Sequence, residues 1–573
     1  MHSNSDRPPE LVQRPPLRWW IPIAAVVLLL GVGIWAVTAF QSATPTAAFA
    51  GPEEKTKEAP PPVPDPVEDR VKAPELEGGI AWLNTASPIR LKDLRGKIVL
   101  LDFWTLCCIN CIHTMPDLAK LEQKYANQLV VIGVHSPKFD TEKETNSIRK
   151  AILRYEIRHP VVNDADMKIW RRYDAHSWPT LVLIDPEGNY LGTASGEGNF
   201  EVLDRVIGKI VEAARKKKTL EEKPLRFDSA QFRDRPDTPL YFPGKVLADA
   251  KGNRLFISDS THHRIVITDL NGKKIAIAGM GHPGKADGPF AQAQFDDPQG
   301  LALSADGNML YVADRRNHLI RSLDLKNQTV TRLAGTGEQE RERSEGGPAL
   351  QRGLNSPWDL YLEGDVLYVA MAGHHQIWAL DLKAGRIEPY AGDGRENIKD
   401  GPLYAARFAQ PSGLTSDGTN LYVADCEVSG VRQVPLGGKG RVETLVGTGL
   451  FDFGDQDGIG KEAQLQHAIG ITYHDGKLYV ADTYNSKIKE IDLKTREVKT
   501  FLGGKGEQGW FVGPLFNEPA GLSYAAGRLY IADTNAHRIR VVDLKTKAVS
   551  TLRIEGVDPV VPAKNESPVS SKQ

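Results

Sequence analysis

"FWTLCCINC", residues 103–111, is the stretch of sequence that decides the fold. Three of the four cysteines in this chain of 573 residues fall within five of its positions. Such a cluster can serve thiol redox chemistry, hold a metal ion or reflect packing alone. Four cysteines are too few for a disulfide-stapled scaffold, so we expect at most one local pair. The surrounding sequence decides between these alternatives.

Strand-like and helix-like patterns alternate around the cysteine cluster. Continuous apolar runs are typical of buried strands, and apolar residues at helical spacing are typical of helices. In chain order the pattern predicts a strand at 97–104, a helix at 115–126, a strand at 129–136, a helix at about 141–155, a hairpin at 180–196 and a helix at 200–217. This order predicts an α/β domain with a central sheet over residues 76–218.

The cysteine pair Cys108 and Cys111 lies where a predicted strand gives way to a predicted helix. A thiolate at a helix N-terminus is stabilised by unpaired N–H groups, which can lower its pKa from about 8.5 toward 3.5–7.5. A spacing of three residues places both sulfurs on one helix face, close enough to form a disulfide. We therefore expect Cys108 to attack a client disulfide and Cys111 to resolve the mixed disulfide.

At this point the chain resembles the thioredoxin superfamily. "DFWTLCCINC" (102–111) matches that family's Asp-Phe-Trp-(three residues)-Cys-x-x-Cys pattern, and "CIHTMPDL" (111–118) is similar to the same region of membrane-anchored, cytochrome-maturation-type thioredoxins. The resemblance implies that Asp102 is the buried acid that helps to move the proton of the resolving thiol. It also implies that Pro179 is the family's cis-proline facing the disulfide and that Trp178 offers backbone groups to a substrate chain.

Two residues depart from the family pattern. Cys107 stands where the family usually has Trp, and Asn110 stands where it often has Pro. These changes leave the redox potential and the direction of electron transfer open. A disulfide between the adjacent Cys107 and Cys108 would be strained, so we interpret Cys107 as modulatory or structural. A zinc site would need a second Cys or His pair at ligand spacing, so we expect neither a metal nor another cofactor.

The second half of the chain is repetitive. One unit occurs six times, and each copy contains two alternating strands around a polar turn. The copies are "LFISDSTHHRIVITDL" (255–270), "LYVADRRNHLIRSLDL" (310–325), "LYVAMAGHHQIWALDL" (367–382), "LYVADCEVSGVRQVPL" (421–436), "LYVADTYNSKIKEIDL" (478–493) and "LYIADTNAHRIRVVDL" (529–544). A short strand precedes each copy and another follows it. Four strands per repeat is the pattern of a propeller blade, so residues 235–555 are predicted to form a six-bladed β-propeller.

These units resemble the NHL repeat, with Asn-His-Leu itself at Asn317-His318-Leu319. A ring of matching histidines could indicate a central metal, but two repeats carry serine at that position, and in this family the position belongs to a structural turn. The positions are His263, His318, His375, Ser429, Ser486 and His537. The Asp series Asp259, Asp314, Asp425, Asp482 and Asp533 is interpreted likewise, because Asp side chains bond to nearby backbone N–H groups. Gly-rich links such as 279–288 and 447–460 are interpreted as loops between blades.

Charge limits the partners. The formal net charge is -2, and acidic and basic side chains nearly balance over 235–555, so we expect no nucleic acid. A protein, peptide or glycan on one propeller face is the predicted ligand. A thioredoxin-like domain joined to a six-bladed NHL propeller resembles the NHL-repeat-containing thioredoxin-like proteins. That resemblance indicates the architecture but not the client.

The N-terminus carries an apolar run of 22 uncharged residues, 19–40. At about 1.5 Å per residue this run can cross a bilayer, and it predicts a transmembrane signal anchor. Arginines lie in 1–18 and no Lys or Arg follows until Lys55, so the N-terminus is expected in the cytoplasm and the C-terminal bulk on the extracytoplasmic side, periplasmic in a bacterium. A cleaved signal peptide ending near "AFA" (48–50) is the alternative, with the chain exported.

Three further segments are expected to lack a core. Residues 41–75 are rich in Pro and charge and predict an extended linker. Residues 219–234 are a second predicted linker, and 556–573 a disordered tail.

Together these patterns predict a membrane-anchored, extracytoplasmic thiol-disulfide oxidoreductase whose propeller binds or presents a protein client. An unknown electron-donor protein would complete the cycle. The alternative is a non-enzymatic propeller adaptor whose thioredoxin-like domain is structural or redox-sensing. A peroxidase ranks third, because the cysteine pair resembles that of reductases.

Overall fold

The computed structural model describes residues 71–227, 236–503 and 515–560. The predicted membrane span at 19–40 therefore lies outside the described residues, as does nearly all of the predicted linker at 41–75. Among the residues that are described, no helix has both the length and the apolar character needed to cross a bilayer.

The first domain is built on a six-stranded sheet in the order β1-β4-β3-β2-β5-β6. Strands β2, β3 and β4 are parallel, and the other pairs are antiparallel. Its elements are β1 (Ala81–Leu83), β2 (Ile98–Trp104), α1 (Ile109–Lys124), β3 (Leu129–His135), α2 (Thr145–Arg154), β4 (Val161–Asn163), α3 (Lys168–Arg172), β5 (Thr180–Ile184), β6 (Tyr190–Ser195) and α4 (Phe200–Lys217). This is the predicted thioredoxin-like α/β arrangement.

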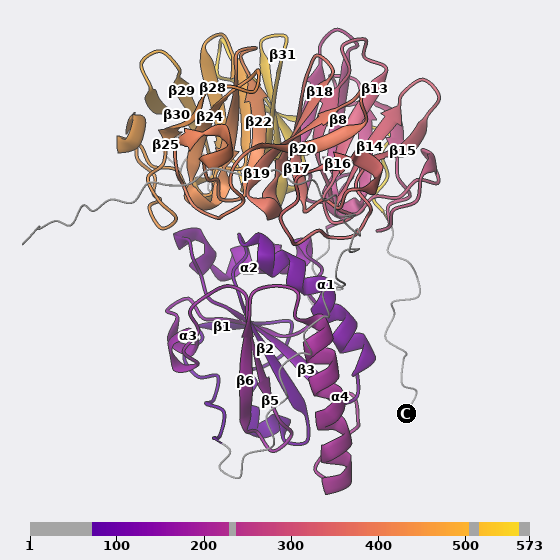
Figure 1. Cartoon of the computed structure of the whole chain (residues 1–573), viewed down its shortest axis with the longest axis vertical. Helices are drawn as coiled ribbons and strands as arrows, with labels where there is room; N and C mark the ends of the chain where they lie inside the picture. The colour runs from indigo at the N-terminus through magenta and orange to yellow at the C-terminus, as the bar shows by residue number, and fades with distance from the viewer. Residues whose placement is uncertain (1–70, 228–235, 504–514, 561–573) are drawn as a thin grey trace, which may run out of the picture. The chain divides into compact units, whose positions relative to one another are not determined.

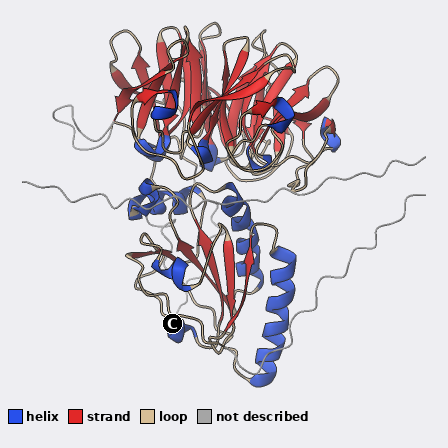
Figure 2. Cartoon of the chain, turned by 60° about the vertical axis from the view of Figure 1, so that its left-hand side comes forward, coloured by secondary structure: helices blue, strands red, loops and turns tan. Residues whose placement is uncertain are grey.

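Helices cover both faces of this sheet (Figure 2). Successive side chains of a strand point to opposite faces, so β2 contributes to two cores. Ile98 and Leu100 pack with apolar residues of α1 and α4. Val99 and Leu101 pack on the other face with apolar residues of α3. Because the alternation continues along β2, Asp102 falls on the face that α1 covers.

The sequence patterns missed three short elements of this domain. Strands β1 and β4 have three residues each, and α3 has five. Segments this short carry too few residues to show a period of 2 or 3.6. The helix expected at 141–155 is a 3-10 turn (Asp140–Lys143) followed by α2.

The second domain consists of six antiparallel sheets, which confirms the predicted six-bladed propeller (Figure 1). The blades comprise β7 (Val246–Asp249), β8 (Arg254–Asp259), β9 (Arg264–Thr268) and β10 (Lys274–Ala278); β11 (Gly288–Pro289), β12 (Pro298–Leu303), β13 (Met309–Asp314), β14 (Leu319–Asp324) and β15 (Thr329–Ala334); β16 (Gly347–Pro348), β17 (Pro357–Glu363), β18 (Val366–Met371), β19 (Gln376–Asp381) and β20 (Arg386–Ala391); β21 (Gly401–Pro402), β22 (Pro411–Ser416), β23 (Asn420–Asp425), β24 (Gly430–Pro435) and β25 (Arg441–Val446); β26 (Gly458–Ile459), β27 (Gly470–His474), β28 (Lys477–Asp482), β29 (Lys487–Asp492) and β30 (Glu497–Gly503); β31 (Pro519–Ala525), β32 (Arg528–Asp533), β33 (Arg538–Asp543) and β34 (Val549–Leu552).

Four blades carry a fifth strand of two residues, which the repeat pattern did not predict. In three of them the strand is a Gly-Pro pair in the link between blades, for example β11, which pairs with β15. Proline cannot donate to a ladder and is therefore confined to sheet edges, where β11 lies. The first blade instead has a bridge from Lys273 to Glu555 near the end of the described chain. Val557, in the predicted tail, is buried.

Side chains tie the blades together at the start of each inner strand. There, two successive backbone N–H groups are held by side chains rather than by a ladder. The first donates at 2.6 to 2.8 Å to the repeat's Asp, and to the sulfur of Met371 at 3.4 Å in the third blade. The second donates at 3.0 to 3.5 Å to the His or Ser of the preceding blade. Both residue series therefore have a structural role, although their bonds join separate strands and neighbouring blades instead of closing a local turn.

The residue that donates the second of these N–H groups has a left-handed backbone in every blade, with φ between 48° and 64°. We call these six the corner residues. They are Phe242, Asp297, Ser356, Gln410, His467 and Glu518.

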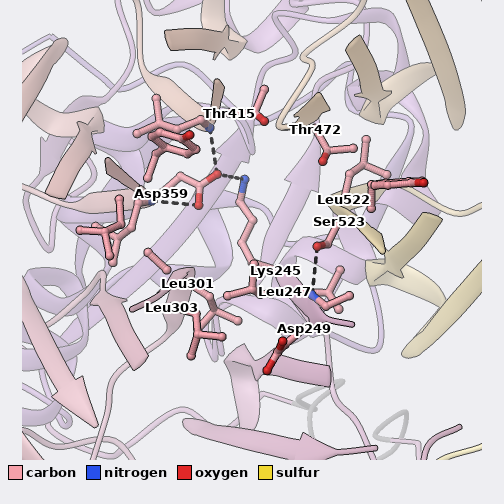
Figure 3. A pocket seen from close by; sticks show the side chains of 18 of the residues that line it. Lys245, Leu247, Asp249, Leu301, Leu303, Asp359, Thr415, Thr472, Leu522 and Ser523 are labelled. Atoms are coloured by element: carbon pink, nitrogen blue, oxygen red, sulfur yellow. Dashed lines mark hydrogen bonds and ion pairs between the residues drawn. The ribbon is translucent and has the colours of Figure 1, made fainter. Parts of the chain in front are cut away.

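The inner strands approach one another closely around the propeller axis. At one shared position, just before a Leu, Ile or Val, four blades carry glycine, and a Cβ on Gly470 would lie 1.9 Å from the carbonyl oxygen of Ala520. The other two blades place Lys245 and Asp359 there. Their side chains form a buried ion pair of 3.1 Å beside a cavity of about 510 Å³ (Figure 3). Lys245 also donates to the carbonyl oxygen of Ser412 at 2.7 Å.

We expect Asp359→Asn to destabilise the propeller by about 3 to 5 kcal/mol, because it leaves the Lys245 charge buried without a counter-ion. The double variant Lys245→Met/Asp359→Leu should recover most of that loss. Urea unfolding of the full chain followed by circular dichroism measures both. The exposed pair of Arg90 and Asp93 is the control, and Asp93→Asn should leave the unfolding midpoint unchanged. A double variant as unstable as Asp359→Asn would contradict this account.

Candidate functional site

Cys108 is the N-cap residue of α1. Its sulfur accepts a hydrogen bond from the backbone N–H of Cys111 at 3.4 Å, so the two cysteines lie together on the first turn. Cys108 is half-buried, Cys111 is buried, and all four cysteines are free thiols. The strand-to-helix junction expected from the sequence therefore places one accessible sulfur over one enclosed sulfur.

The Trp178–Pro179 peptide lies beside this pair and is cis. The Cys108 thiol contacts the carbonyl oxygen of Trp178, with 3.8 Å between sulfur and oxygen. The Trp178 ring lies 4.6 Å from that of Trp170 on α3, which fixes the loop against the sheet. The structure thus brings Cys108, Cys111, Trp178 and Pro179 together, while their roles remain predictions.

Asp102 lies on the face of the sheet that α1 covers, near enough for its charge to act on Cys111. It is buried, and its Oδ1 atom has no hydrogen-bond partner. Burial raises the pKa of Asp102 to about 7, while the nearby His159 acts in the opposite direction. Burial also raises the pKa of the Cys111 thiol well above its ordinary value, and Cys108 and the charge of Asp102 raise it further. Burial therefore favours the protonated form of both the carboxyl and the inner thiol.

Cys107 is buried in an apolar cluster, with two acidic side chains nearby. Its N–H donates to Glu142 Oε1 at 3.0 Å. Burial, followed by Glu142 and Glu427, raises the pKa of the Cys107 thiol well above its ordinary value. A thiol that stays protonated is a poor nucleophile. The arrangement separates Cys107 chemically from its neighbour Cys108, although the two are adjacent in sequence.

A propeller side chain satisfies the start of helix α1. Gln410 Oε1 accepts the N–H of Ile109 at 2.9 Å, and its Nε2 donates to the carbonyl oxygen of Cys107 at 2.9 Å. The same Nε2 contacts the sulfur of the fully buried Cys426 at 3.2 Å. The N–H groups at a helix start have no partner within the helix, so Gln410 fills a need that α1 cannot meet itself.

Other corner residues also contact the thioredoxin-like domain. Ser356 Oγ lies 2.6 Å from His113 Nε2, and Glu518 accepts from Arg154 on α2 at 2.8 Å. The His467 ring lies 5.3 Å from that of Phe139. His113, two positions after Cys111, is bound on its other nitrogen by Glu197 at 2.5 Å. Its side chain is therefore held in a network rather than free to act as a base.

Two buried acids complete the contact region. Glu142 accepts the N–H of Phe139 at 3.1 Å and the hydroxyl of Thr105 at 2.5 Å. Glu427 pairs with Lys138, and both side chains are almost fully buried. Within the described ranges, no three His, Cys, Asp or Glu side chains group in a way that could hold a metal ion.

Sequence reasoning missed Gln410, Ser356 and Glu518. Each stands directly before the proline that opens an inner strand, in "AQP", "NSP" and "NEP". The position before this proline could be recognised in the repeats, but its side chain differs from blade to blade. Aligning the repeats on this proline and asking why one position varies could have identified them.

Comparison with known proteins supports both domains. A family model described as thioredoxin-like matches residues 96–190, and the NHL repeat model matches 295–321 and 516–542. The thiol-disulfide oxidoreductase YkuV of Bacillus subtilis is 26% identical over 143 residues, which are 25% of this chain and 95% of that protein. The thioredoxin-like domain thus resembles thiol-disulfide oxidoreductases.

Two relatives extend over both domains. "NHL repeat-containing protein 2" of Gallus gallus is 44% identical over 532 residues, covering 86% of this chain and 72% of that protein. "Protein SUPPRESSOR OF QUENCHING 1, chloroplastic" of Arabidopsis thaliana is 43% identical over 512 residues, covering 85% of this chain and 48% of that protein.

The predicted localisation, a single-pass membrane protein with an extracytoplasmic C-terminal bulk, is wrong. It is contradicted by the similarity to a relative whose name places it in the chloroplast. An apolar N-terminal run is a weak guide to location, because anchors and targeting segments share that pattern.

The alignment with the relative from Gallus gallus covers both domains and shows the family. The chain belongs to the family of NHL repeat-containing protein 2.

Proposed function

We propose that the chain is a thiol-disulfide oxidoreductase acting on a protein client that the propeller helps to hold. The observation that carries the proposal is the geometry at the start of α1, where the half-buried Cys108 sulfur accepts from Cys111 N–H beside the cis peptide of Trp178. An attacking thiol needs access and a stabilised thiolate, and a resolving thiol needs to lie one turn deeper.

The proposed exchange has two steps. The Cys108 thiolate attacks one sulfur of a client disulfide, and the other client sulfur leaves as a thiolate. Cys111 then gives up its proton and attacks the Cys108 sulfur of the mixed disulfide. The Cys108–Cys111 bond forms, the client is released reduced, and a donor protein of unknown identity reduces the pair again.

A cleft that begins at Ile112, one residue after Cys111, is the proposed place for the client. It measures about 870 Å³ and is lined by α1, by the segment 155–159 and by propeller loops. Acidic and basic side chains both line it, with Ile112 and Met115 among the apolar members. A protein or peptide chain offers the mixture of backbone, apolar and charged groups that such a wall can bind.

One observation favours the adaptor alternative. The N–H of Ile109 at the helix start is already occupied by Gln410, and Cys108 is only half-exposed. If the chain is an adaptor, the cysteine pair reports the redox state through its contact with the propeller and does not catalyse disulfide exchange with clients.

We expect Cys108→Ser to abolish reduction of insulin by the full chain in the presence of a thiol reductant. Cys111→Ser should accumulate a mixed disulfide, because its Cys108 still attacks but nothing resolves the product. Cys426→Ala is the matched control and should reduce insulin normally, since Cys426 is fully buried in the propeller. Turbidity and non-reducing gels measure the two outcomes.

Reduction that survives Cys108→Ser would remove the oxidoreductase. A Cys111→Ser chain that captures no client while folding normally would favour the adaptor instead.

Asp102→Asn should stabilise the chain at pH 8 and leave its stability unchanged near pH 3. The pKa of Asp102 is raised from 3.8 to about 7, so its favourable contribution is full below pH 3.8 and is lost as the pH rises through 7. Ionising such a buried carboxyl costs up to about 4 kcal/mol, and the variant avoids that cost. Urea unfolding at a series of pH values measures the difference.

The control for this pH dependence is Asp306, whose pKa is lowered to about 2 by hydrogen bonds from Ser304 and Asn308. Asp306→Asn should have the opposite sign and lose stability above pH 4. An Asp102→Asn chain with a pH profile parallel to that of the original chain would show that folding does not raise the pKa of Asp102.

A further inference from the structure

A proton must cross the protein interior in the proposed second step. Cys111 and Asp102 are both buried, so the proton that leaves the thiol cannot pass directly to water. The following inference rests on the proposed function and concerns the route of that proton.

A gap in strand β3 lies next to Asp102. Asp102 on β2 pairs in register with Gly133 on β3. A Cβ on Gly133 would lie 2.9 Å from Trp104 Nε1 and 3.5 Å from His159 Nε2. The missing side chain of Gly133 therefore leaves space that the side chains of Trp104 and Val161 share with the His159 ring, on the same face of the sheet as Asp102.

The other side of the His159 ring leads toward solvent. Its Nδ1 atom lies 3.3 Å from Glu122 Oε2 on α1. His159 is almost fully buried, whereas the side chain of Glu122 is 28% exposed. Both residues line the cleft of about 870 Å³. His159 thus connects the surroundings of the buried carboxyl with the cleft, which Glu122 also lines.

The electrostatic surroundings of Asp102 and His159 favour proton transfer between them in both directions. The titratable groups that face His159 are Glu122 from α1 and Asp102 from β2, and Asp102 in turn faces Cys111 from α1. Burial lowers the pKa of His159, but Glu122 and then Asp102 raise it above its ordinary value. Burial places the pKa of Asp102 at about 7. Groups of similar proton affinity exchange protons without a large barrier.

We propose that His159 is a proton-relay residue that carries the proton between Asp102 and the cleft, with Glu122 orienting its outer nitrogen. In the resolving step the Cys111 thiol gives its proton to the Asp102 carboxylate. The Cys111 sulfur attacks Cys108, the bond from Cys108 to the client sulfur breaks, and the client leaves with that electron pair. Asp102 then passes the proton to His159 Nε2, and the Nδ1 proton goes by way of Glu122 to water in the cleft.

The test separates the two chemical steps with an aromatic disulfide, Ellman's reagent, mixed with the reduced full chain. The first coloured thiolate is released when Cys108 attacks, and the second when Cys111 resolves the mixed disulfide. His159→Gln should slow the second release about tenfold, less than the 10²- to 10⁴-fold effect of a direct general base, and leave the first unchanged. The midpoint of the second step should move to higher pH, because His159 no longer lowers the pKa of Asp102.

Two further variants test the route itself. Glu122→Gln should slow the second release in the same direction by a smaller factor, and the exposed His176→Gln should have no effect. Adding His159→Gln to Asp102→Asn should slow the second release no further, because the relay acts only through that carboxyl.

Other outcomes would overturn the relay. They are a second release that His159→Gln and Glu122→Gln leave unchanged in rate and pH dependence, or additive losses in the double variant. Equal slowing of both releases would indicate a general structural loss, which circular dichroism checks. Failure of the proposed function is distinct, because it would appear in the original chain as release that does not depend on Cys108.

Discussion

The structure depends on how two backbone N–H groups are satisfied at the start of each inner propeller strand. One is held by an Asp of the same blade, or by Met371 in the third, and the next by a His or Ser of the blade before. A buried N–H without a partner is costly, so each corner is stable only when its neighbouring blade is in place. The ring therefore closes by side-chain contacts that no single repeat could make.

The same corners contact the start of the helix that carries the cysteine pair. Each second N–H belongs to a residue in the left-handed conformation, and the side chains of several of these residues contact the thioredoxin-like domain. Gln410 is the most consequential, since it bonds to both Ile109 and Cys107 at the start of α1. A bond that closes the propeller and a bond that satisfies the start of helix α1 thus share one residue. The backbone of Gln410 serves the first, and its amide serves the second.

Much of this could be predicted from the sequence, because the signals were periodic or local. Six copies of one unit predicted six blades, and the apolar run before Cys108 predicted the strand-to-helix junction. Three-residue strands and the two-residue Gly-Pro strands left no period to detect. His159 was beyond reach as well, since its meaning comes from the absence of a side chain at Gly133 on another strand. The predicted localisation failed because hydropathy alone does not identify a compartment.

Six nearly equivalent corners raise a problem of rotational degeneracy. If every corner bore the same side chain, a second domain could dock on the ring in six orientations of equal energy. Here an aromatic ring, a hydroxyl, an amide, an imidazole and two carboxylates occupy the six corners in a fixed order. Only one rotation brings the amide to the start of α1 and a carboxylate to Arg154. The corner side chains, which differ between the repeats, therefore distinguish each blade of the ring from the next.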